Sequence, residues 1–489
     1  MSMPQKLEFL SKELVHQILE EAFQLLNVPG IKVHSAQARE LLAAAGASVE
    51  ETRQVVHIPE RLVRSVLEKV PSAFYLYDAG NRPAIHYGED QVHFDPGSSG
   101  LKVLDAEDFQ ERLATTPDLI RLIQTTEMLP QYDAQSTAVV CHEVPQEISD
   151  LYRLYLVLLF SAKPVVTGTF SASSIQPMID MLAIFSGSRR ALMNRPRAVF
   201  DVCPSPPLIW SEFGCQNLIE LARNGIPTQI VSMPLAGAAA PVTLLGSVVQ
   251  HAAETLSGIV IHQLAQAGSP VIWGGAAAIL DMRHGTTPMG AMETAMIDAA
   301  CAQIGKSLNL PTHAYLGASD AKIVDAQAGL ESGLTLLVGA MAGINMISGA
   351  GMLDYLACLS AEKLVLDAEA IAMVRRLLRG MTVQTEPLAT EMFREFDFKG
   401  EFLKQKITRQ LYRKEQYIPS QVIDRASRRA WQQEGSLNAF QRARKHVDEL
   451  LGNYQRPEIP AEQERALHKL VTHLARQAGM DQLPSLAGY

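Results

Sequence analysis

The pattern of hydrophobic and polar positions divides the chain into three parts. In the N-terminal part, three stretches have apolar residues at helical spacing: residues 15–26, 36–45 and 60–70. Residues 55–59 predict a short strand, and three alternating runs separated by Gly and Asn turns predict others at 74–77, 85–87 and 92–94. A loop is expected at residues 95–100. Residues 1–117 are therefore expected to form a small α+β domain.

From about residue 118, short strands rich in Val and Ile alternate with helical stretches. The predicted strands are residues 137–141, 164–169, 198–203, 228–233, 270–273, 312–315 and 343–347. Their starts are about one βα unit apart, and they lack alternation, as strands buried on both faces do. This predicts an α/β fold with a (β/α)8 TIM barrel over residues 118–380. A doubly wound sheet is the alternative, but no GxGxxG follows a first strand.

The eighth strand of this barrel is expected either at residues 355–359 or before Thr137. Ser360 is a predicted N-cap for a helix that closes near Arg379. Residues 381–489 are helical and mixed in charge, with a linker at 452–460. Both flanking regions are expected to pack around the barrel, with its polar and Gly-rich loops gathered at one mouth.

Composition excludes several classes of protein. Hydrophobic residues make up 47% and charged residues 19% of the 489 residues, which argues against a disordered chain. The net charge of -9 argues against nucleic-acid partners and against a polybasic membrane anchor. Five widely spaced cysteines and the lack of a secretory signal predict a reducing, cytoplasmic location. Residues 332–353 are uncharged and long enough to span a bilayer, but their glycines favour a buried helix, a turn and a buried strand.

Common catalytic motifs are missing from the sequence. It has no Walker loop, no GxSxG and no HExxH, and its cysteines form no cluster for a metal. Cys141 and His142 are adjacent, so on a strand they would face opposite ways, which disfavours a nucleophile pair.

Barrel enzymes carry function at the C-terminal ends of their strands, so the loops there are the candidates. Those at Gly237 and at Gly349 and Gly351 are small and flat, which lets a planar partner approach the backbone, although tight βα turns have the same composition. Asp320, Lys322 and Asp325 are either catalytic or a structural ion network.

Several motifs together resemble the trimethylamine methyltransferase superfamily. They are residues 319–328, 342–345, 349–354 and 364–369, with 234–237, 241–244 and 41–49 in support. The resemblance covers most of the chain and weakens after about residue 385. It implies a barrel that moves a methyl group from an amine to the cobalt of a separate corrinoid protein. No cofactor is then expected to be bound tightly, since the partner carries the corrinoid (cobalamin), and a homo-oligomer is expected.

The archaeal trimethylamine enzymes of this family carry pyrrolysine, whereas this chain has only the twenty standard residues. It therefore resembles the non-pyrrolysine branch of the family. That branch is similar to the glycine betaine and other quaternary-amine methyltransferases. A quaternary ammonium releases a neutral tertiary amine without being protonated. The expected substrate is a methylated cation such as a betaine, with trimethylamine a poor one.

The resemblance implies roles for the residues of the expected mouth. Because the substrate loses its charge in the transition state, aromatic faces should hold it only moderately. The candidates for substrate binding are Phe94, Trp273, Tyr315, Tyr355 and Gln327, with Arg283 or loop amides for a carboxylate. Asp320, Lys322 and Asp325 are the catalytic candidates, and Gly237, Gly349 and Gly351 would face the corrinoid.

Several features of the sequence fit more than one interpretation. No histidine occurs between His313 and His446, so the loop at 348–351 offers cobalt no axial ligand. Asp281 and Arg283 could simply brace a loop. Two other functions also fit: a methyltransferase with another acceptor, such as a folate, and a non-catalytic betaine-binding barrel.

Overall fold

Parallel strands form the centre of the protein, whose computed structural model describes residues 6–394, 398, 402–486 and 488. A five-stranded parallel sheet has the order β15 (Val271–Gly275), β13 (Thr228–Ser232), β11 (Ala198–Val202), β10 (Val165–Gly168), β9 (Gln135–Ser136). A three-stranded parallel sheet has the order β17 (His313–Ala314), β18 (Met346–Ala350), β6 (His93–Pro96).

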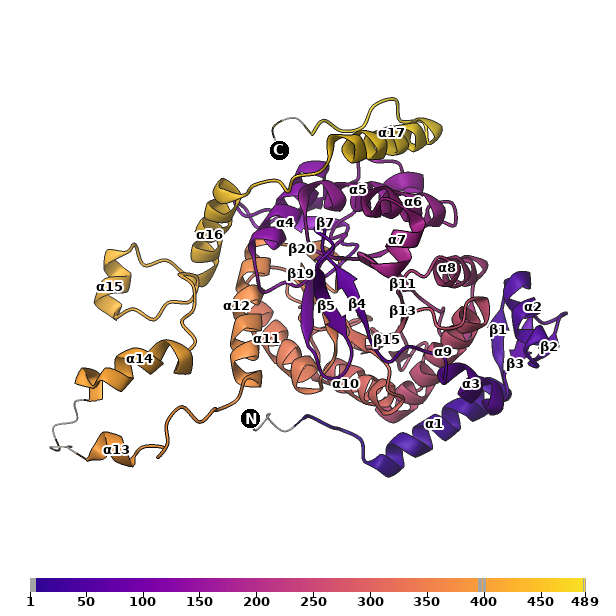
Figure 1. Cartoon of the computed structure of the whole chain (residues 1–489), viewed down its shortest axis with the longest axis horizontal. Helices are drawn as coiled ribbons and strands as arrows, with labels where there is room; N and C mark the ends of the chain where they lie inside the picture. The colour runs from indigo at the N-terminus through magenta and orange to yellow at the C-terminus, as the bar shows by residue number, and fades with distance from the viewer. Residues whose placement is uncertain (1–5, 395–397, 399–401, 487, 489) are drawn as a thin grey trace.

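The two sheets contact each other at both ends. A parallel bridge between Trp273 and Thr312 links β15 to the segment that enters β17. On the other side, the backbone N–H of Asp133 donates to the carbonyl of Phe94 at 2.8 Å, next to β9. The strands therefore follow one another from β9 through β15, β17 and β18 to β6 and back to β9, with helices outside them (Figure 1). The predicted α/β class is confirmed.

A further parallel strand of the central series is β6, which lies before Thr137. It pairs in parallel with β18, so it belongs with the central strands and not only with the N-terminal part in which a strand at 92–94 was expected. The alternative at residues 355–359 was wrong. The strand found there, β20 (Cys358–Leu359), pairs with β19 (Met352–Leu353) and with β7 (Lys102–Leu104), which also pairs with β8 (Glu111–Leu113). The strand expected at 137–141 is replaced by β9, which ends at Ser136.

Helices surround these strands. They are α4 (Thr116–Met128), α5 (Ser149–Phe160), α6 (Ile175–Ser186), α7 (Arg189–Asn194), α8 (Glu212–Arg223), α9 (Leu244–Ala265), α10 (Met292–Ser307), α11 (Ala326–Met341) and α12 (Ala361–Leu378). The expected helix, turn and strand at 332–353 are confirmed by α11 and β18, and the Ser360 hydroxyl caps α12 as predicted. Of the described helices, α9 alone is long and apolar enough to cross a membrane, but 83% of its apolar window is buried within the protein.

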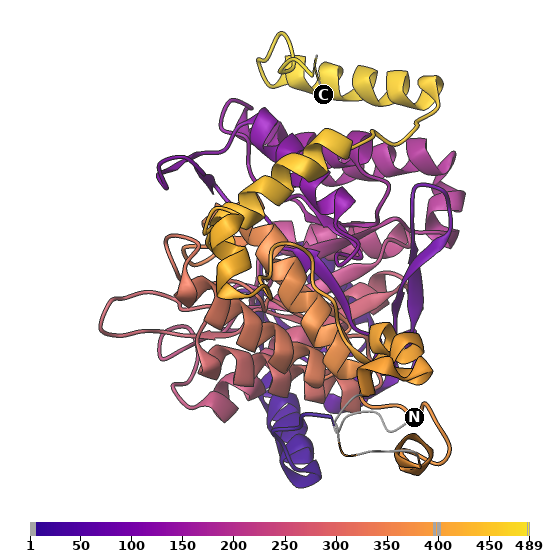
Figure 2. The same ribbon diagram turned by 90° about the vertical axis from the view of Figure 1, so that its left-hand side faces the viewer.

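A β-hairpin covers the N-terminal ends of the central strands. It consists of β4 (Phe74–Tyr77) and β5 (Pro83–Tyr87), and it packs on strand residues that include Val199, Ile272 and Met346. These contacts define the inner face of the central strands. Figure 2 shows the hairpin on the right and the loops that follow the central strands on the left. The C-terminal ends of the strands, called the mouth below, therefore lie opposite the hairpin.

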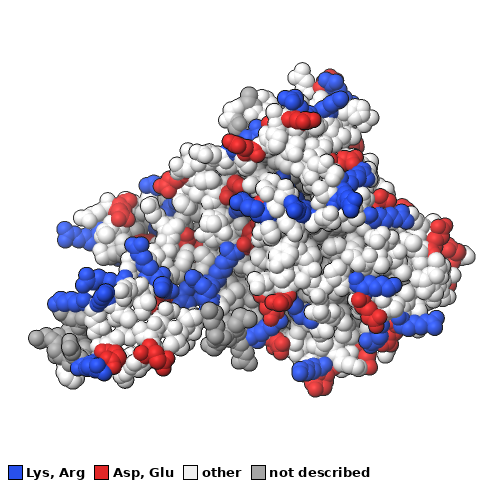
Figure 3. Space-filling model, in the orientation of Figure 1, with Lys and Arg blue, Asp and Glu red and all other residues white. Residues whose placement is uncertain are grey.

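The terminal regions pack on the outside. The N-terminal elements α1 (Lys12–Asn27), β1 (Ile31–Val33), α2 (Ala36–Ala44), β2 (Ser48–Glu50), β3 (Val55–His57) and α3 (Glu60–Leu67) lie beside α8 and α9, and β12 (Ile209–Trp210) pairs with β1. In the C-terminal region, α16 (Ala439–Asn453) packs on α4 and α12, and α17 (Ala461–Gln477) packs on α5 and α6. Three short helices, α13 (Thr390–Phe393), α14 (Lys406–Glu415) and α15 (Arg428–Gln433), project away, with Lys and Arg on their surface (Figure 3).

Candidate active site

The inner face of the central strands changes from apolar to polar towards the mouth. Side chains two residues apart on a strand share a face, so Asp201 lies on the same inner face as Val199. In the same way, Ser348 follows Met346 on β18. The hairpin closes the apolar end of this interior, and polar side chains gather at the other end.

Asp201 is the central carboxyl group of this polar layer. It accepts hydrogen bonds from the Gln229 amide at 2.7 Å and from the Tyr315 hydroxyl at 2.9 Å. Burial raises the pKa of Asp201 to about 7, although both hydrogen bonds act in the opposite direction. The residue is only partly covered from solvent. A carboxyl group at the mouth therefore changes its charge near neutral pH.

A second carboxyl group, Asp95, enters the interior from β6. It accepts a hydrogen bond of 2.5 Å from the Ser348 hydroxyl, whose oxygen lies 3.0 Å from Nε2 of His313. Burial raises the pKa of Asp95 well above its ordinary value, and the charge of Asp201 raises it further. Burial also lowers the pKa of His313 to about 3. His313 is therefore neutral at pH 7.

Four buried polar atoms of this interior have no hydrogen-bond partner among the described residues. They are the Tyr87 hydroxyl, Asp95 Oδ2, Gln229 Oε1 and His313 Nδ1. Leaving such a group unsatisfied costs about 1–3 kcal/mol, so their concentration in one place indicates a site for a polar ligand or water. Most of these atoms can accept hydrogen bonds, and Tyr315 adds an aromatic ring, which is a composition that suits a small cation.

The mouth is open to solvent above Asp201. Tyr315 and Gly168 are partly exposed there. Phe170, Cys203 and Met233, which follow β10, β11 and β13, are exposed at its edge. A ligand could therefore reach the polar layer from this side.

Comparison with known proteins identifies the family. The family model described as trimethylamine methyltransferase (MTTB) matches residues 2–480. The chain belongs to this family. It is 29% identical to the trimethylamine methyltransferase MttB of Desulfitobacterium hafniense over 470 residues, which cover 96% of this chain and 94% of that one. It is 32% identical to the MttB of Methanosarcina barkeri over 446 residues, or 90% and 89% of the two chains.

Another relative in this comparison is a glycine betaine methyltransferase of Desulfitobacterium hafniense. It is 28% identical over 477 residues, which cover 97% of this chain and 98% of that one. Among solved structures, the monomethylamine methyltransferase MtmB of Methanosarcina barkeri matches with a TM-score of 0.49 at 13% identity, over 90% of this chain and 94% of that one. The relatives are named methyltransferases, and the chain is an enzyme of that class.

Of the predicted aromatic residues, only Tyr315 reaches the interior of this methyltransferase. Ile272 faces inward, so Trp273 faces outward, where its ring lies 5.7 Å from that of His251 on α9. Phe94 likewise faces outward, beneath the guanidinium group of Arg375 on α12, which lies 5.2 Å from the ring centre. The structure therefore does not bring Phe94 and Trp273 to the mouth.

The ring of Tyr355 already carries a cation of the protein itself. The Lys322 ammonium lies 3.9 Å from the ring centre and 3.2 Å from a carboxylate oxygen of Asp354. The same ammonium donates to the carbonyl of Asp320 at 2.6 Å. Lys322 and Tyr355 thus join two neighbouring loops, and the ring of Tyr355 is occupied by a cation of the protein.

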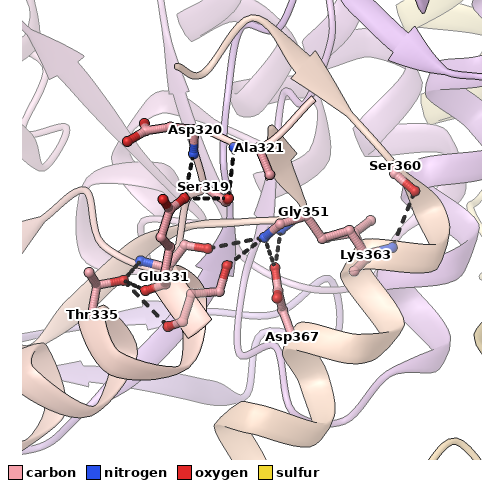
Figure 4. Close-up of polar contacts among 12 residues, drawn as sticks. Ser319, Asp320, Ala321, Glu331, Thr335, Gly351, Ser360, Lys363 and Asp367 are labelled. Atoms are coloured by element: carbon pink, nitrogen blue, oxygen red, sulfur yellow. Dashed lines mark hydrogen bonds and ion pairs between the residues drawn. The ribbon is translucent and has the colours of Figure 1, made fainter. Parts of the chain in front are cut away.

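Asp320, Asp325 and Gln327 make contacts that fix the mouth loops. Asp320 accepts from the backbone N–H of Met289 at 2.8 Å, and its own N–H donates to Glu331 at 2.8 Å (Figure 4). Asp325 caps α11 by accepting from the Gln327 N–H at 2.9 Å, and the Gln327 amide donates to Glu331. These contacts join neighbouring loops and place none of the three side chains in the polar interior.

Arg283 lies on a surface loop. Its side chain is 81% exposed and pairs with Asp281 at 2.6 Å. This is the bracing arrangement that the spacing of the two residues allows. The described residues also contain no group of three or more His, Cys, Asp or Glu side chains that could hold a metal ion.

The three predicted corrinoid-facing glycines have different environments. Gly237 is exposed in its turn, whereas Gly349 and Gly351 are buried. A Cβ atom on Gly349 would lie 2.7 Å from the Leu316 carbonyl, and one on Gly351 would lie 2.5 Å from Leu364. Gly349 and Gly351 therefore allow close packing beneath the mouth, and only Gly237 presents a surface.

Replacing Gly349 by alanine is expected to lower the free energy of unfolding by about 1–3 kcal/mol, because the backbone that its Cβ would meet cannot move aside. The matched control is Gly333→Ala in α11, where a Cβ would meet nothing within 4 Å and alanine favours the helix. Thermal unfolding of both variants measures the difference. Equal melting temperatures would contradict the steric argument.

A buried ion pair holds the loops of the mouth from below. Lys363 on α12 lies 2.6 Å from Asp367 and donates to the Ser332 hydroxyl at 2.7 Å. Asp367 in turn accepts from the Gly351 N–H at 2.7 Å (Figure 4). The pair therefore connects α11 and α12 to the loop that follows β18. The sequence analysis did not predict this pair; Asp367 lies in the family-like run at 364–369, but Lys363 precedes that run.

Proposed function

We propose that this methyltransferase takes a methyl group from a quaternary methylated amine, such as a betaine, and passes it to a corrinoid carried by a separate protein. The observation that carries the proposal is the polar interior, where Asp201 and Tyr315 lie at an open mouth. We further propose that the eight central strands form a closed (β/α)8 barrel. In this division the barrel spans residues 118–380, and the N-terminal region, residues 1–117, contributes β6.

The charge of Asp201 suits this reaction. An ionised Asp201 attracts the ammonium group, and the Tyr315 ring offers it an aromatic face. When the methyl group leaves, the nitrogen becomes neutral and this attraction is lost, so tight binding of the cation would oppose catalysis. A carboxyl group whose pKa is about 7 gives a moderate attraction at neutral pH. The neutral amine product is then released easily.

The edge of the mouth fits a planar partner. Exposed apolar side chains of Phe170, Met233, Val242 and Met282 lie in the loops that follow the strands, and Val242 lies next to the Gly237 turn. These residues would contact a corrinoid presented by another protein. The corrinoid would supply the Co(I) nucleophile that accepts the methyl group. Asp201 and Tyr315 would hold the substrate nitrogen so that one methyl group points out of the mouth, since alignment of the reacting atoms provides much of the acceleration.

The test is methyl transfer from choline, glycine betaine or trimethylamine to reduced cobalamin, with tetrahydrofolate as the competing acceptor. We expect the quaternary amines to cause loss of the Co(I) absorbance and formation of the demethylated amine, faster than trimethylamine does. Methylation of tetrahydrofolate without any corrinoid would favour the folate alternative. Binding without transfer to either acceptor would favour a betaine-binding protein, and faster reaction with trimethylamine would overturn the substrate.

A further inference from the structure

Arg153 on α5 is a fully buried cation without a carboxylate partner. Its Nη1 donates to the Ser99 hydroxyl at 3.1 Å and to the Thr137 carbonyl at 2.8 Å. Its Nε and Nη2 atoms are buried and have no hydrogen-bond partner among the described residues. The guanidinium group therefore has two unused donors on one side.

The neighbours of Arg153 place it at the mouth. Ser99 follows β6, Thr137 follows β9, and Phe170 follows β10, and these three strands are neighbours in the central series. The Phe170 ring lies 4.4 Å from the guanidinium carbon and is itself 43% exposed. Phe170 thus separates the buried guanidinium group from solvent at the edge of the mouth.

The nearest carboxylate on the same helix is already used. Asp150 accepts from the Phe170 N–H at 2.7 Å and from the Ser174 hydroxyl at 2.8 Å, so it holds the segment that covers Arg153. Burial lowers the pKa of Arg153 to about 10, which leaves it charged at neutral pH. A buried charge without a paired counter-charge is costly in free energy, and an anionic ligand would relieve that cost.

Arg153 and Asp201 form an electrostatic pattern that matches a zwitterion. Asp201 pairs with Gly168 of β10, two residues before Phe170, whose ring lies 4.4 Å from the Arg153 guanidinium carbon. We infer that Arg153 binds the carboxylate of a betaine whose ammonium group lies at Asp201 and Tyr315. This inference rests on the proposed function and names the group that would select carboxylated substrates. A bidentate guanidinium–carboxylate contact would use the two free donors.

Arg197 shows that unused nitrogen atoms alone do not mark a ligand site. It is also buried, donates to the Ser161 carbonyl at 2.6 Å, lies 4.9 Å from the Phe185 ring centre, and has two nitrogen atoms without partners. However, Arg197 directly precedes β11, at the hairpin end of the strands. Position at the mouth is what distinguishes Arg153, and Arg197 is its matched control.

The experiment is calorimetric titration of Arg153→Met, Arg197→Met, Arg283→Ala and the unmodified enzyme. The ligands are glycine betaine, γ-butyrobetaine and tetramethylammonium, the last of which has no carboxylate. We expect the unmodified enzyme to prefer at least one carboxylated ligand. Arg153→Met should raise the Kd of that ligand at least about tenfold, as expected for the loss of a hydrogen bond to a charged group. It should change the Kd of tetramethylammonium less than about twofold. Arg197→Met and Arg283→Ala should leave the preference unchanged.

Other results would overturn the inference. An equal loss for both kinds of ligand, or a loss of preference in Arg283→Ala only, would exclude Arg153 as the carboxylate-binding residue. If Arg153→Met does not fold, Arg153→Lys, which keeps the charge but loses the planar fork, should reduce the preference at least threefold, and an unchanged preference would exclude the role. An unmodified enzyme that binds tetramethylammonium without preferring a carboxylated ligand defeats this inference alone. One that binds no quaternary amine defeats the proposed function itself.

Discussion

Replacing Asp201 by asparagine is expected to lower kcat/KM for a quaternary amine by about 30-fold or more. Asparagine keeps the size of the side chain and can still accept from the Tyr315 hydroxyl, but it removes the negative charge that faces the ammonium group. Truncating one partner of a buried charged contact typically costs about 2–5 kcal/mol, which corresponds to this loss or a larger one. Steady-state kinetics with choline and glycine betaine would measure it. The control is Tyr315→Phe, which keeps the aromatic ring and leaves the Asp201 carboxylate in place. Its kcat/KM should fall much less.

The same variant should change the dependence of cation binding on pH. In the unmodified enzyme, binding of tetramethylammonium should strengthen as the pH rises through about 7, because Asp201 loses its proton there. The Asp201→Asn variant should show no such rise. A pH profile that is the same in both proteins would exclude Asp201 as the group that attracts the cation.

Stability should respond to pH with the opposite sign. The folded protein holds the Asp201 proton more tightly than the unfolded chain, because burial raises the pKa in the folded state. The stability from this group is complete below the ordinary pKa of about 4 and is lost as the pH rises to about 7. The melting temperature of Asp201→Asn relative to that of the unmodified protein should therefore increase as the pH is raised from 5 to 8.

Replacing Lys363 by methionine is expected to lower the free energy of unfolding by about 3–5 kcal/mol. The Lys363 and Asp367 side chains are almost fully buried, so the change leaves the Asp367 carboxylate in the interior without its counter-charge. It also removes the donor to the Ser332 hydroxyl, a contact that joins α12 to α11. Thermal unfolding measures the loss, and reduced methyl transfer should accompany it, since the pair supports the mouth loops.

The control is the double variant Lys363→Met with Asp367→Leu. Replacing both charges by apolar side chains removes the uncompensated carboxylate, so the double variant should be more stable than the single one. The Gly351 N–H loses its acceptor in the double variant, so recovery should be incomplete. If the double variant is no more stable than Lys363→Met, the cost does not come from the unpaired charge.

The sequence by itself was enough to predict the α/β class and most central strands. Parallel strands covered on both faces are continuously apolar, and a helix connects each strand to the next. The resulting alternation of apolar strands and helices can be read from the sequence. The Ser360 cap and the burial of residues 332–353 were equally local, because they depend on a hydroxyl before a helix and on missing charge. The motifs from Asp320 to Asp354 were enough to indicate the family, which the family model confirms.

Only the tertiary structure decided which side chains face the interior. A strand that is apolar on both faces gives no alternation from which its inner side could be read, so Trp273 and Phe94 were as plausible as Tyr315. Asp201 did give a signal, since it is a charged residue within a predicted buried strand, but its partners Gln229 and Tyr315 come from strands far away in the sequence. Arg153 is on a helix with no motif, and β6 resembles any short strand until it pairs with β18. These positions depend on contacts between distant segments, which local composition does not encode.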